Sequence, residues 1–136
     1  KYKKANQNFK IDKKKFSNLK LKLKLNKKKI SKQETRISSI SKNIINKNEK
    51  IFIFGSGNYS LDLLSKMKIS KNVIGYIESN KIYHGNKRNN FYVYSLKDAL
   101  EIRYDKIIIA SQAFKKEIYN ILIKNSVKKN KIITFN

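Results

Sequence analysis

The sequence predicts an α/β fold, with a small three-layer domain built on a mainly parallel five-stranded sheet and preceded by a basic extension. Three observations support this prediction. Short apolar runs alternate with helical patterns over residues 49–136, all four glycines lie there, and residues 1–48 hold seventeen Lys or Arg against two acids. Alternating strands and helices are typical of parallel sheets with right-handed crossovers. The change in composition places the boundary between the Lys-rich extension and the folded domain near Asn48.

The extension carries two periodic patterns. Leucines at every second position from Leu19 to Leu25 alternate with lysines, which predicts a strand with one wet face. Leu and Lys also form helices readily, so a helix is the alternative. Isoleucines then recur at spacings of 7, 3 and 4, which predicts an amphipathic helix from about Lys29 to Asn46 that docks on the following domain. These residues are Ile30, Ile37, Ile40 and Ile44.

The formal net charge is +24, and Lys supplies all but three of the 33 positive charges. This charge predicts attraction to polyanions at low salt, but Lys lacks the planar fork with which Arg reads bases and clamps phosphates. The run Lys27–Lys29 can bind nucleic acid or an anionic membrane surface, or it can be a solvated charged face. We favour the solvated face because no aromatic residue interleaves these lysines. Any nucleic-acid binding is expected to be weak, non-specific and steeply salt-dependent.

Several classes of site are excluded by what the sequence lacks. It has no Cys and one His, His84, which removes disulfide scaffolds, thiolate metal sites and cysteine nucleophiles and predicts no metal centre. There is no run of 18 or more apolar residues and no signal peptide, so we expect no membrane span. Because the first residue is Lys rather than Met, we expect the chain to be part of a longer protein.

From residue 49 onward the elements follow in order. Lys50–Phe54 is a continuous apolar run, as expected of a strand buried on both faces. A Gly turn follows, Leu61–Met67 has a helical face, and Asn72–Ile77 is the second strand. The third strand is Phe91–Tyr94. After it, Ser95 can cap a helix and Asp98 can complete the capping box. The fourth and fifth strands are Lys106–Ala110 and Lys131–Phe135, and the helix between them has an apolar face of Phe114, Ile118, Ile121 and Leu122.

The first strand is the most apolar of the five, which predicts that it lies at the centre of the sheet. The expected strand order is 3-2-1-4-5, with the Gly turn in the middle of the carboxyl edge. Ligands of open α/β sheets bind at that edge.

The turn after the first strand is a candidate phosphate site. Its sequence is Gly55-Ser56-Gly57-Asn58-Tyr59-Ser60. Gly55 lets the chain turn tightly, Gly57 lets a phosphate approach the backbone, and the helix that begins near Asn58 offers free amide groups to an anion. Ser60 takes the place of a third Gly, so we expect the helix to lie slightly farther from the strand.

Two further residues are predicted to face the same crevice. Glu78 lies 21 residues after Gly57 at the tip of the second strand, where an acid can accept hydrogen bonds from ribose hydroxyls. Alternatively, the glycines only shape the turn and Glu78 pairs with surplus Lys. Ser111, at the end of the fourth strand, either touches a ligand or caps the next helix. The candidate ligand-binding residues are Gly55, Ser56, Gly57, Asn58, Glu78 and Ser111.

No catalytic residue is predicted. His84 is interpreted as a bystander, since a loop His without a nearby acid in sequence is a poor general base. Tyr59 is interpreted as packing rather than as a cover for a base or sugar. The sequence shows no Ser-His-Asp spacing, no paired carboxylates and no G-K-[ST] phosphate loop.

Taken together, the ordered motifs resemble a small Rossmann-like domain of bacterial surface-polysaccharide enzymes. It occurs as the N-terminal domain of membrane-linked nucleotide-sugar epimerases and dehydratases and of sugar acyltransferases, and as the C-terminal domain of sugar C-methyltransferases. The family usually has Asp where Glu78 stands and Gly near Asn89 or Asn90, and Asn tolerates the left-handed backbone. The resemblance covers about residues 49–136. Its motifs here are Lys50–Gly57, Val73–Asn80, Lys81–Gly85, Val93–Leu96 and Tyr104–Ser111.

This resemblance implies a cytoplasmic module, at the inner membrane face in the membrane-linked case, that binds a nucleotide-bearing small molecule such as NAD(P) or a nucleotide-sugar. It implies that a fused or separate glycan-biosynthesis enzyme domain is its partner and that a homo-oligomer can form. We expect the chain to be non-catalytic in isolation. The first alternative is a fragment of a sugar C-methyltransferase or nucleotide-sugar epimerase or dehydratase whose catalytic part lies elsewhere. The second is a non-specific nucleic-acid or anionic-membrane binder acting through residues 1–48.

Overall fold

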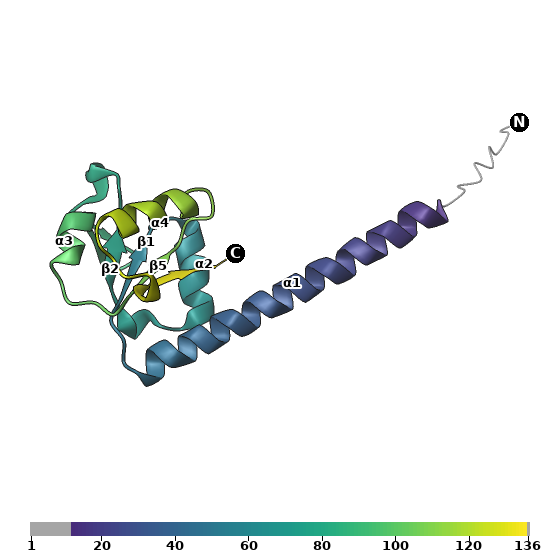
Figure 1. Cartoon of the computed structure of the whole chain (residues 1–136), viewed down its shortest axis with the longest axis horizontal. Helices are drawn as coiled ribbons and strands as arrows, with labels where there is room; N and C mark the ends of the chain where they lie inside the picture. Colours follow the sequence, from purple (N-terminus) through teal and green to yellow (C-terminus); the bar gives the residue numbers. More distant parts are fainter. Residues whose placement is uncertain (1–11, 136) are drawn as a thin grey trace, which may run out of the picture. The chain divides into compact units, whose positions relative to one another are not determined.

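The structure is a computed structural model that describes residues 12–135, so residues 1–11 of the predicted extension lie outside the described residues. Its helices are α1 (Lys13–Asn46), α2 (Asn58–Met67), α3 (Leu96–Leu100) and α4 (Lys115–Lys124), with short 3-10 turns at Ser70–Asn72, Lys81–Tyr83 and Lys129–Lys131. Its strands are β1 (Ile51–Phe54), β2 (Val73–Ile77), β3 (Lys87–Arg88), β4 (Phe91–Tyr94), β5 (Lys106–Ile109) and β6 (Ile132–Thr134). Figure 1 labels the principal elements.

The six strands form one sheet in the order β3-β4-β2-β1-β5-β6. The five predicted strands correspond to β1, β2, β4, β5 and β6, so the predicted order 3-2-1-4-5 is confirmed. Strand β1 pairs in parallel with β2 on one side and β5 on the other, and the outer pairs β2–β4 and β5–β6 are also parallel. The sheet places the carboxyl ends of β1, β2 and β5 next to one another.

Strand β3 was not predicted. It pairs antiparallel with β4, Lys87 opposite Tyr92 and Arg88 opposite Phe91. The two residues between them, Asn89 and Asn90, have φ angles of 50° and 68°. Positive φ at both central residues is the geometry of the hairpin turn whose twist suits two antiparallel strands.

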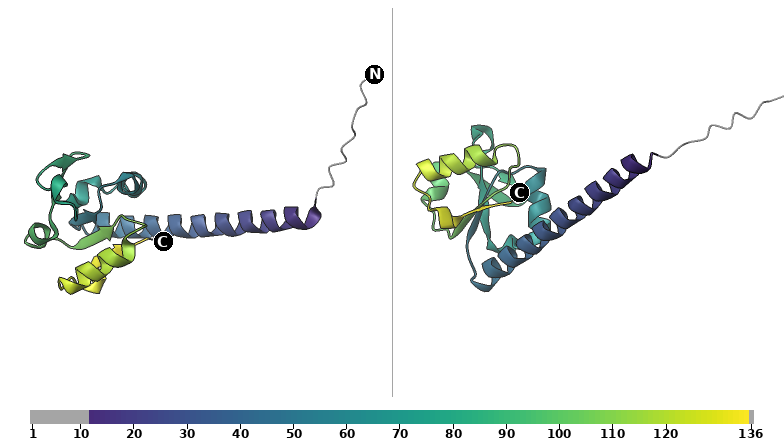
Figure 2. Two further views of the ribbon diagram at one scale, coloured as in Figure 1. Left: turned by 90° about the horizontal axis from the view of Figure 1, so that it is seen from above. Right: turned by 45° about the vertical axis from the view of Figure 1, so that its right-hand side comes forward.

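The core lies on both faces of the sheet and covers both faces of β1, all four of whose residues are buried. On one face Ile51 and Ile53 pack in a cluster with side chains of α2 and of residues 35–46 of α1. On the other, Phe52 and Phe54 pack with side chains of α3 and α4. Figure 2 shows α2 and α4 on opposite sides of the sheet. The three-layer α/β fold predicted from the sequence is therefore confirmed.

The strand predicted for Leu19 to Leu25 is wrong, because this segment lies within the 34-residue helix α1. A lone strand leaves its backbone N–H and C=O groups without partners, whereas a helix pairs them within the segment. Leu and Lys both have high helix propensity. None of the helices in the part of the chain that the structure describes is long and apolar enough to cross a membrane.

The last turns of α1 belong to the domain core, as the isoleucine spacing predicts. Ile37 and Ile44 are 6% and 1% exposed, whereas Ile30 is 56% exposed. Between the two buried isoleucines, the Ser41 hydroxyl donates a hydrogen bond of 2.7 Å to the Ile37 carbonyl. The chain divides into two compact units between Glu34 and Thr35. The boundary near Asn48 stays a prediction about where the functional domain starts.

Candidate functional site

A cleft of about 580 Å³ opens at the carboxyl ends of β1, β2 and β5. It is within the usual size range for small-molecule sites. All six candidate residues line it, as do Tyr59 from α2 and several residues of α4 and the loop before it. The structure thus brings together every residue that the sequence placed at this edge of the sheet.

Gly55 shapes the turn from β1 into α2. Its φ is 103°, and a Cβ at this position would lie 2.9 Å from the Ala110 carbonyl oxygen. Its N–H donates a hydrogen bond of 2.9 Å to the Ile77 carbonyl. The backbone here therefore runs too close to the end of β5 to admit a side chain.

We expect Gly55→Ser to lower the free energy of unfolding by about 1–3 kcal/mol, from the positive φ and the overpacking together. The matched control is Gly57→Ser, two residues on, which should leave stability unchanged or slightly higher because Ser is a good helix N-cap. Urea denaturation followed by circular dichroism measures both. Equal effects of the two substitutions would contradict this assignment of Gly55.

Gly57 differs from Gly55 because the fold does not require a glycine there. Its φ is −79°, and a Cβ would meet no atom within 4 Å. It is the N-cap of α2, and no side chain caps this helix, whereas Ser95 caps α3 by accepting the Asp98 N–H at 3.1 Å. The first two residues of α2, Asn58 and Tyr59, line the cleft without a side-chain cap on the helix, and uncapped N–H groups at a helix start can bind an anion.

Ser60 occupies the place of a third Gly without being exposed. Its relative exposure is 0%, and its hydroxyl donates a hydrogen bond of 2.6 Å to the Gly57 carbonyl. The bond satisfies the buried hydroxyl within the helix itself. Ser60 is therefore accommodated as a buried, hydrogen-bonded side chain, and the expected displacement of the helix from the strand stays a prediction.

Glu78 is tied to the Gly turn rather than to a surplus Lys. Its Oε1 accepts two hydrogen bonds of 2.6 Å from Ser56, one from the backbone N–H and one from the hydroxyl. The Arg88 guanidinium donates to the same hydroxyl at 2.9 Å and lies 4.6 Å from the centre of the Tyr83 ring. Oε2 accepts no hydrogen bond from any residue between 12 and 135, and the role of Glu78 as a ribose acceptor stays a prediction that concerns this oxygen.

His84 contacts the same loop. Its Nε2 lies 2.7 Å from the Glu78 carbonyl oxygen, which can only accept, so Nε2 carries the proton. That nitrogen fastens the loop after β2 and is not available as a base. The sequence reading of His84 as a bystander missed this contact, because the turn that brings it back to Glu78 is not visible in the spacing.

Ser111 makes a cap-type bond and also lines the cleft. Its hydroxyl oxygen accepts the Phe114 N–H at 3.2 Å, just before α4 begins. The hydroxyl proton stays available to a ligand, so the two alternatives left open by the sequence are compatible. One wall of the cleft was not predicted from the sequence. It consists of Phe114, just before α4, and of Glu117, Ile118 and Ile121 of α4.

The cleft and the perturbed ionisable group lie apart. Burial raises the pKa of Tyr104, which precedes β5 and so lies at the amino edge of the sheet, opposite the cleft. Among residues 12–135, no three His, Cys, Asp or Glu side chains come together in a way that would hold a metal ion. The cleft offers backbone amides, hydroxyls, amide side chains and the carboxylates of Glu78 and Glu117 to a ligand.

Residues 47–133 match the family described as C2185-like, N-terminal. The chain belongs to this family. The matched residues run from just before β1 to the middle of β6, so they include every candidate residue of the cleft. A similar solved chain is UDP-D-quinovosamine 4-dehydrogenase from Vibrio fischeri, with 22% sequence identity and a TM-score of 0.49 over 65% of this chain and 78% of that one. No curated protein matches the chain.

Proposed function

We propose that this C2185-like domain is a nucleotide- or sugar-nucleotide-binding module of a bacterial surface-glycan biosynthesis protein, without catalysis of its own in isolation. The observation that carries the proposal is Gly57. The fold leaves the space over this residue empty and tolerates a side chain there, so the glycine is best explained by a ligand that passes over the backbone. The uncapped N-terminus of α2 lies directly beside it.

A phosphate in this cleft would have to be held by backbone amides rather than by side-chain cations. No Lys or Arg is among the residues that line the cleft, whereas Glu78 and Glu117 are. A phosphate therefore has to be met by the N–H groups at the start of α2, where the helix dipole also favours negative charge. Arg88, which donates a hydrogen bond to the Ser56 hydroxyl, adds a positive charge next to this lining residue.

The remaining walls suit the rest of a nucleotide. Oε2 of Glu78 can accept a hydrogen bond from a ribose or sugar hydroxyl. Phe114, just before α4, and Ile118 and Ile121 of α4 offer apolar contacts to a base. Asn58, Asn80 and Gln112 also line the cleft, and their amide side chains can hydrogen-bond to hydroxyl groups.

The resemblance to bacterial surface-polysaccharide enzymes supports the class of pathway, and it also supplies the enzymatic alternative. In that alternative the chain is the binding part of a sugar C-methyltransferase or a nucleotide-sugar epimerase or dehydratase whose catalytic part lies outside it. The full reading frame separates the two, because the module is shared and the fused domain sets the reaction.

The test is a titration of the purified chain with NAD, NADP, UDP-sugars, CDP-sugars and CoA, read out as melting temperature. We expect one class to bind and Glu78→Gln to weaken it by about 1–3 kcal/mol, because Gln keeps an oxygen for Ser56 but presents no acceptor in place of Oε2. Glu117→Gln is the control, as the other acid of the cleft, and should change binding less. Absence of binding by every compound would refute the proposal.

A further inference from the structure

Helix α1 carries an apolar stripe of which only the last part belongs to the domain core. Apolar side chains recur every seven residues, at Phe16, Leu23, Ile30, Ile37 and Ile44. The last two are buried. The first three and Leu19 form a surface that we call the heptad seam, and each of its members is between 53% and 60% exposed.

The seam has the width of a coiled-coil interface. In heptad terms Phe16, Leu23 and Ile30 occupy position a and Leu19 occupies position d. Such a narrow stripe fits a partner helix, whereas docking on a globular core uses a broader apolar face. Asn26 and Gln33 occupy the next two d positions, so the apolar part of the seam narrows to the a positions there, at a cost in stability.

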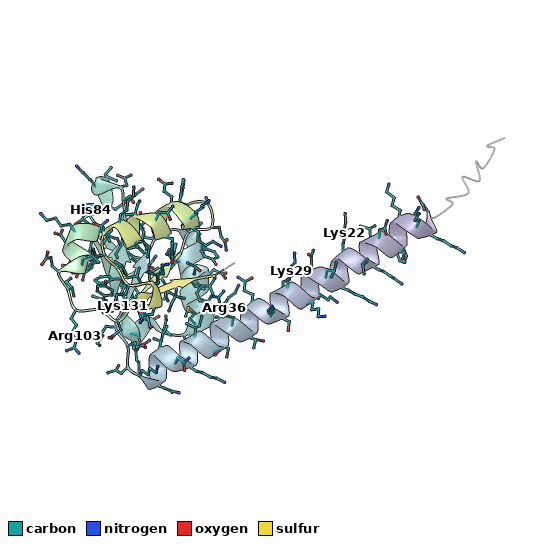
Figure 3. All side chains as sticks on the ribbon, in the orientation of Figure 1. Lys22, Lys29, Arg36, His84, Arg103 and Lys131 are labelled. Atoms are coloured by element: carbon teal, nitrogen blue, oxygen red, sulfur yellow. The ribbon has the colours of Figure 1, made fainter. Side chains whose placement is uncertain are left out.

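Lysines flank the seam on both sides. They are Lys15, Lys22 and Lys29 at the g positions and Lys20 and Lys27 at the e positions, and all are exposed. Figure 3 shows Lys22 and Lys29 extending from the surface of the helix. Side chains at e and g face the flanks of the partner helix and decide which partner pairs. The partner must therefore carry Asp or Glu at these positions.

A second copy of this chain does not meet that requirement. In a parallel pair the facing g and e residues would be Lys15 with Lys20, Lys22 with Lys27, and Lys29 with Glu34. Two of these three pairs repel. Like charges across a coiled coil disfavour the pairing, so self-association through the seam is opposed.

Nucleic acid and membrane fit the seam less well. A nucleic-acid backbone would meet the lysines but leave the apolar seam exposed to water. A helix lying in a membrane interface keeps its apolar residues on one face, whereas Leu21 and Leu25 lie on the side opposite the seam at 3.6 residues per turn. They are 58% and 53% exposed.

We propose that residues 13–34 bind an acidic amphipathic helix of a partner protein, with its apolar residues in the seam and its carboxylates against the flanking lysines. This inference rests on α1 alone and does not depend on the cleft or its ligand. Its partner is defined by chemistry: apolar residues at a and d, and Asp or Glu at e and g.

The experiment uses the full chain and a synthetic peptide of the same helical length as residues 13–34, with Ile at a, Leu at d and Glu at e and g. The reference is a peptide of identical composition with the heptad order scrambled. Fluorescence anisotropy of the labelled peptides measures affinity, and sedimentation velocity measures stoichiometry. We expect a 1:1 complex with the heptad peptide and binding at least about tenfold weaker with the scrambled one, because only the first buries the seam.

Matched variants separate the seam from the rest of the helix. The double variant Leu19→Ser, Leu23→Ser should weaken binding roughly a hundredfold, since each buried Leu contributes about tenfold or more. The control is Leu21→Ser, Leu25→Ser, which removes the same two side chains from the same helix outside the seam and should stay within about threefold. Because both variants change helix propensity equally, circular dichroism should report equal helix content.

Four outcomes would overturn the proposal. Equal binding of the scrambled peptide would mean that charge alone acts, and equal loss in the two double variants would remove the seam from the interface. A chain that sediments as a dimer without any peptide would make a second copy the occupant. Tighter binding to vesicles of equal parts phosphatidylcholine and phosphatidylglycerol than to the heptad peptide, lost in the seam variant, would make the helix a membrane-surface element.

Discussion

Gly57→Val is expected to abolish binding of the nucleotide ligand while leaving the domain folded. The branched side chain would fill the space over the N-terminus of α2, through which a diphosphate passes in the proposed binding mode. The backbone at this residue has a φ of −79°, which Val adopts, and a Cβ there touches nothing within 4 Å. The cost to stability is therefore limited to a poorer N-cap, about 1 kcal/mol.

The measurement is the melting temperature with and without the ligand that binds the unmodified chain. A ligand at 100 times its dissociation constant stabilises by about 2.7 kcal/mol, which for a domain of this size raises the melting temperature by about 10–20 °C. We expect this shift to be absent in Gly57→Val and partly kept in Gly57→Ala, which adds a single carbon. An unchanged shift in the Val variant would leave the glycine as a feature of the turn alone and would move the ligand elsewhere.

Ile44→Ala is expected to lower the free energy of unfolding by about 2–5 kcal/mol. Ile44 is 1% exposed and packs in the same cluster as Leu63 and Met67 of α2. Truncation would leave a cavity between the last turns of α1 and the domain. The loss would show that these turns are part of the folded unit and not a separate extension.

Ile30→Ala is the matched control, because it makes the same substitution at the same heptad position of the same helix. Ile30 is 56% exposed, so its truncation should change stability by no more than about 0.5 kcal/mol. Urea denaturation of both variants, followed by far-ultraviolet circular dichroism, gives the comparison. Similar losses for the two residues, or none for Ile44, would contradict the docking of α1 on the domain.

Much of the sheet could be predicted because its strands are short apolar runs flanked by clear turn signals. In the first predicted strand, Ile51 to Phe54 are all apolar. A strand without a polar face has to be covered on both faces, which predicts its place at the centre of the sheet. The parallel order came from the helices between strands, since a right-handed crossover leaves few alternatives. The convergence of Gly57, Glu78 and Ser111 followed in turn, because parallel strands end at one edge.

The hairpin of β3 and β4 could not be predicted with the same reasoning. Strand β3 is a pair of basic residues, Lys87 and Arg88, with no apolar pattern. The local signal is Asn89-Asn90, which tolerates positive φ, but this tolerance alone does not indicate that a hairpin forms. The pairing partner, Phe91–Tyr92, decides that these two residues become a strand.

The sequence alone determined the α/β class, the strand order and the edge at which the candidate residues gather, because burial pattern and crossover handedness depend on residue type and order. Tertiary structure decided the rest. The alternation of Leu19 to Leu25 became helix because no strand was available to pair with it. Glu78 bonded to Ser56, and His84 to the Glu78 carbonyl, because the turn after β2 folds back on the Gly turn. Such contacts depend on where loops meet in space, which the spacing of residues along the chain does not contain.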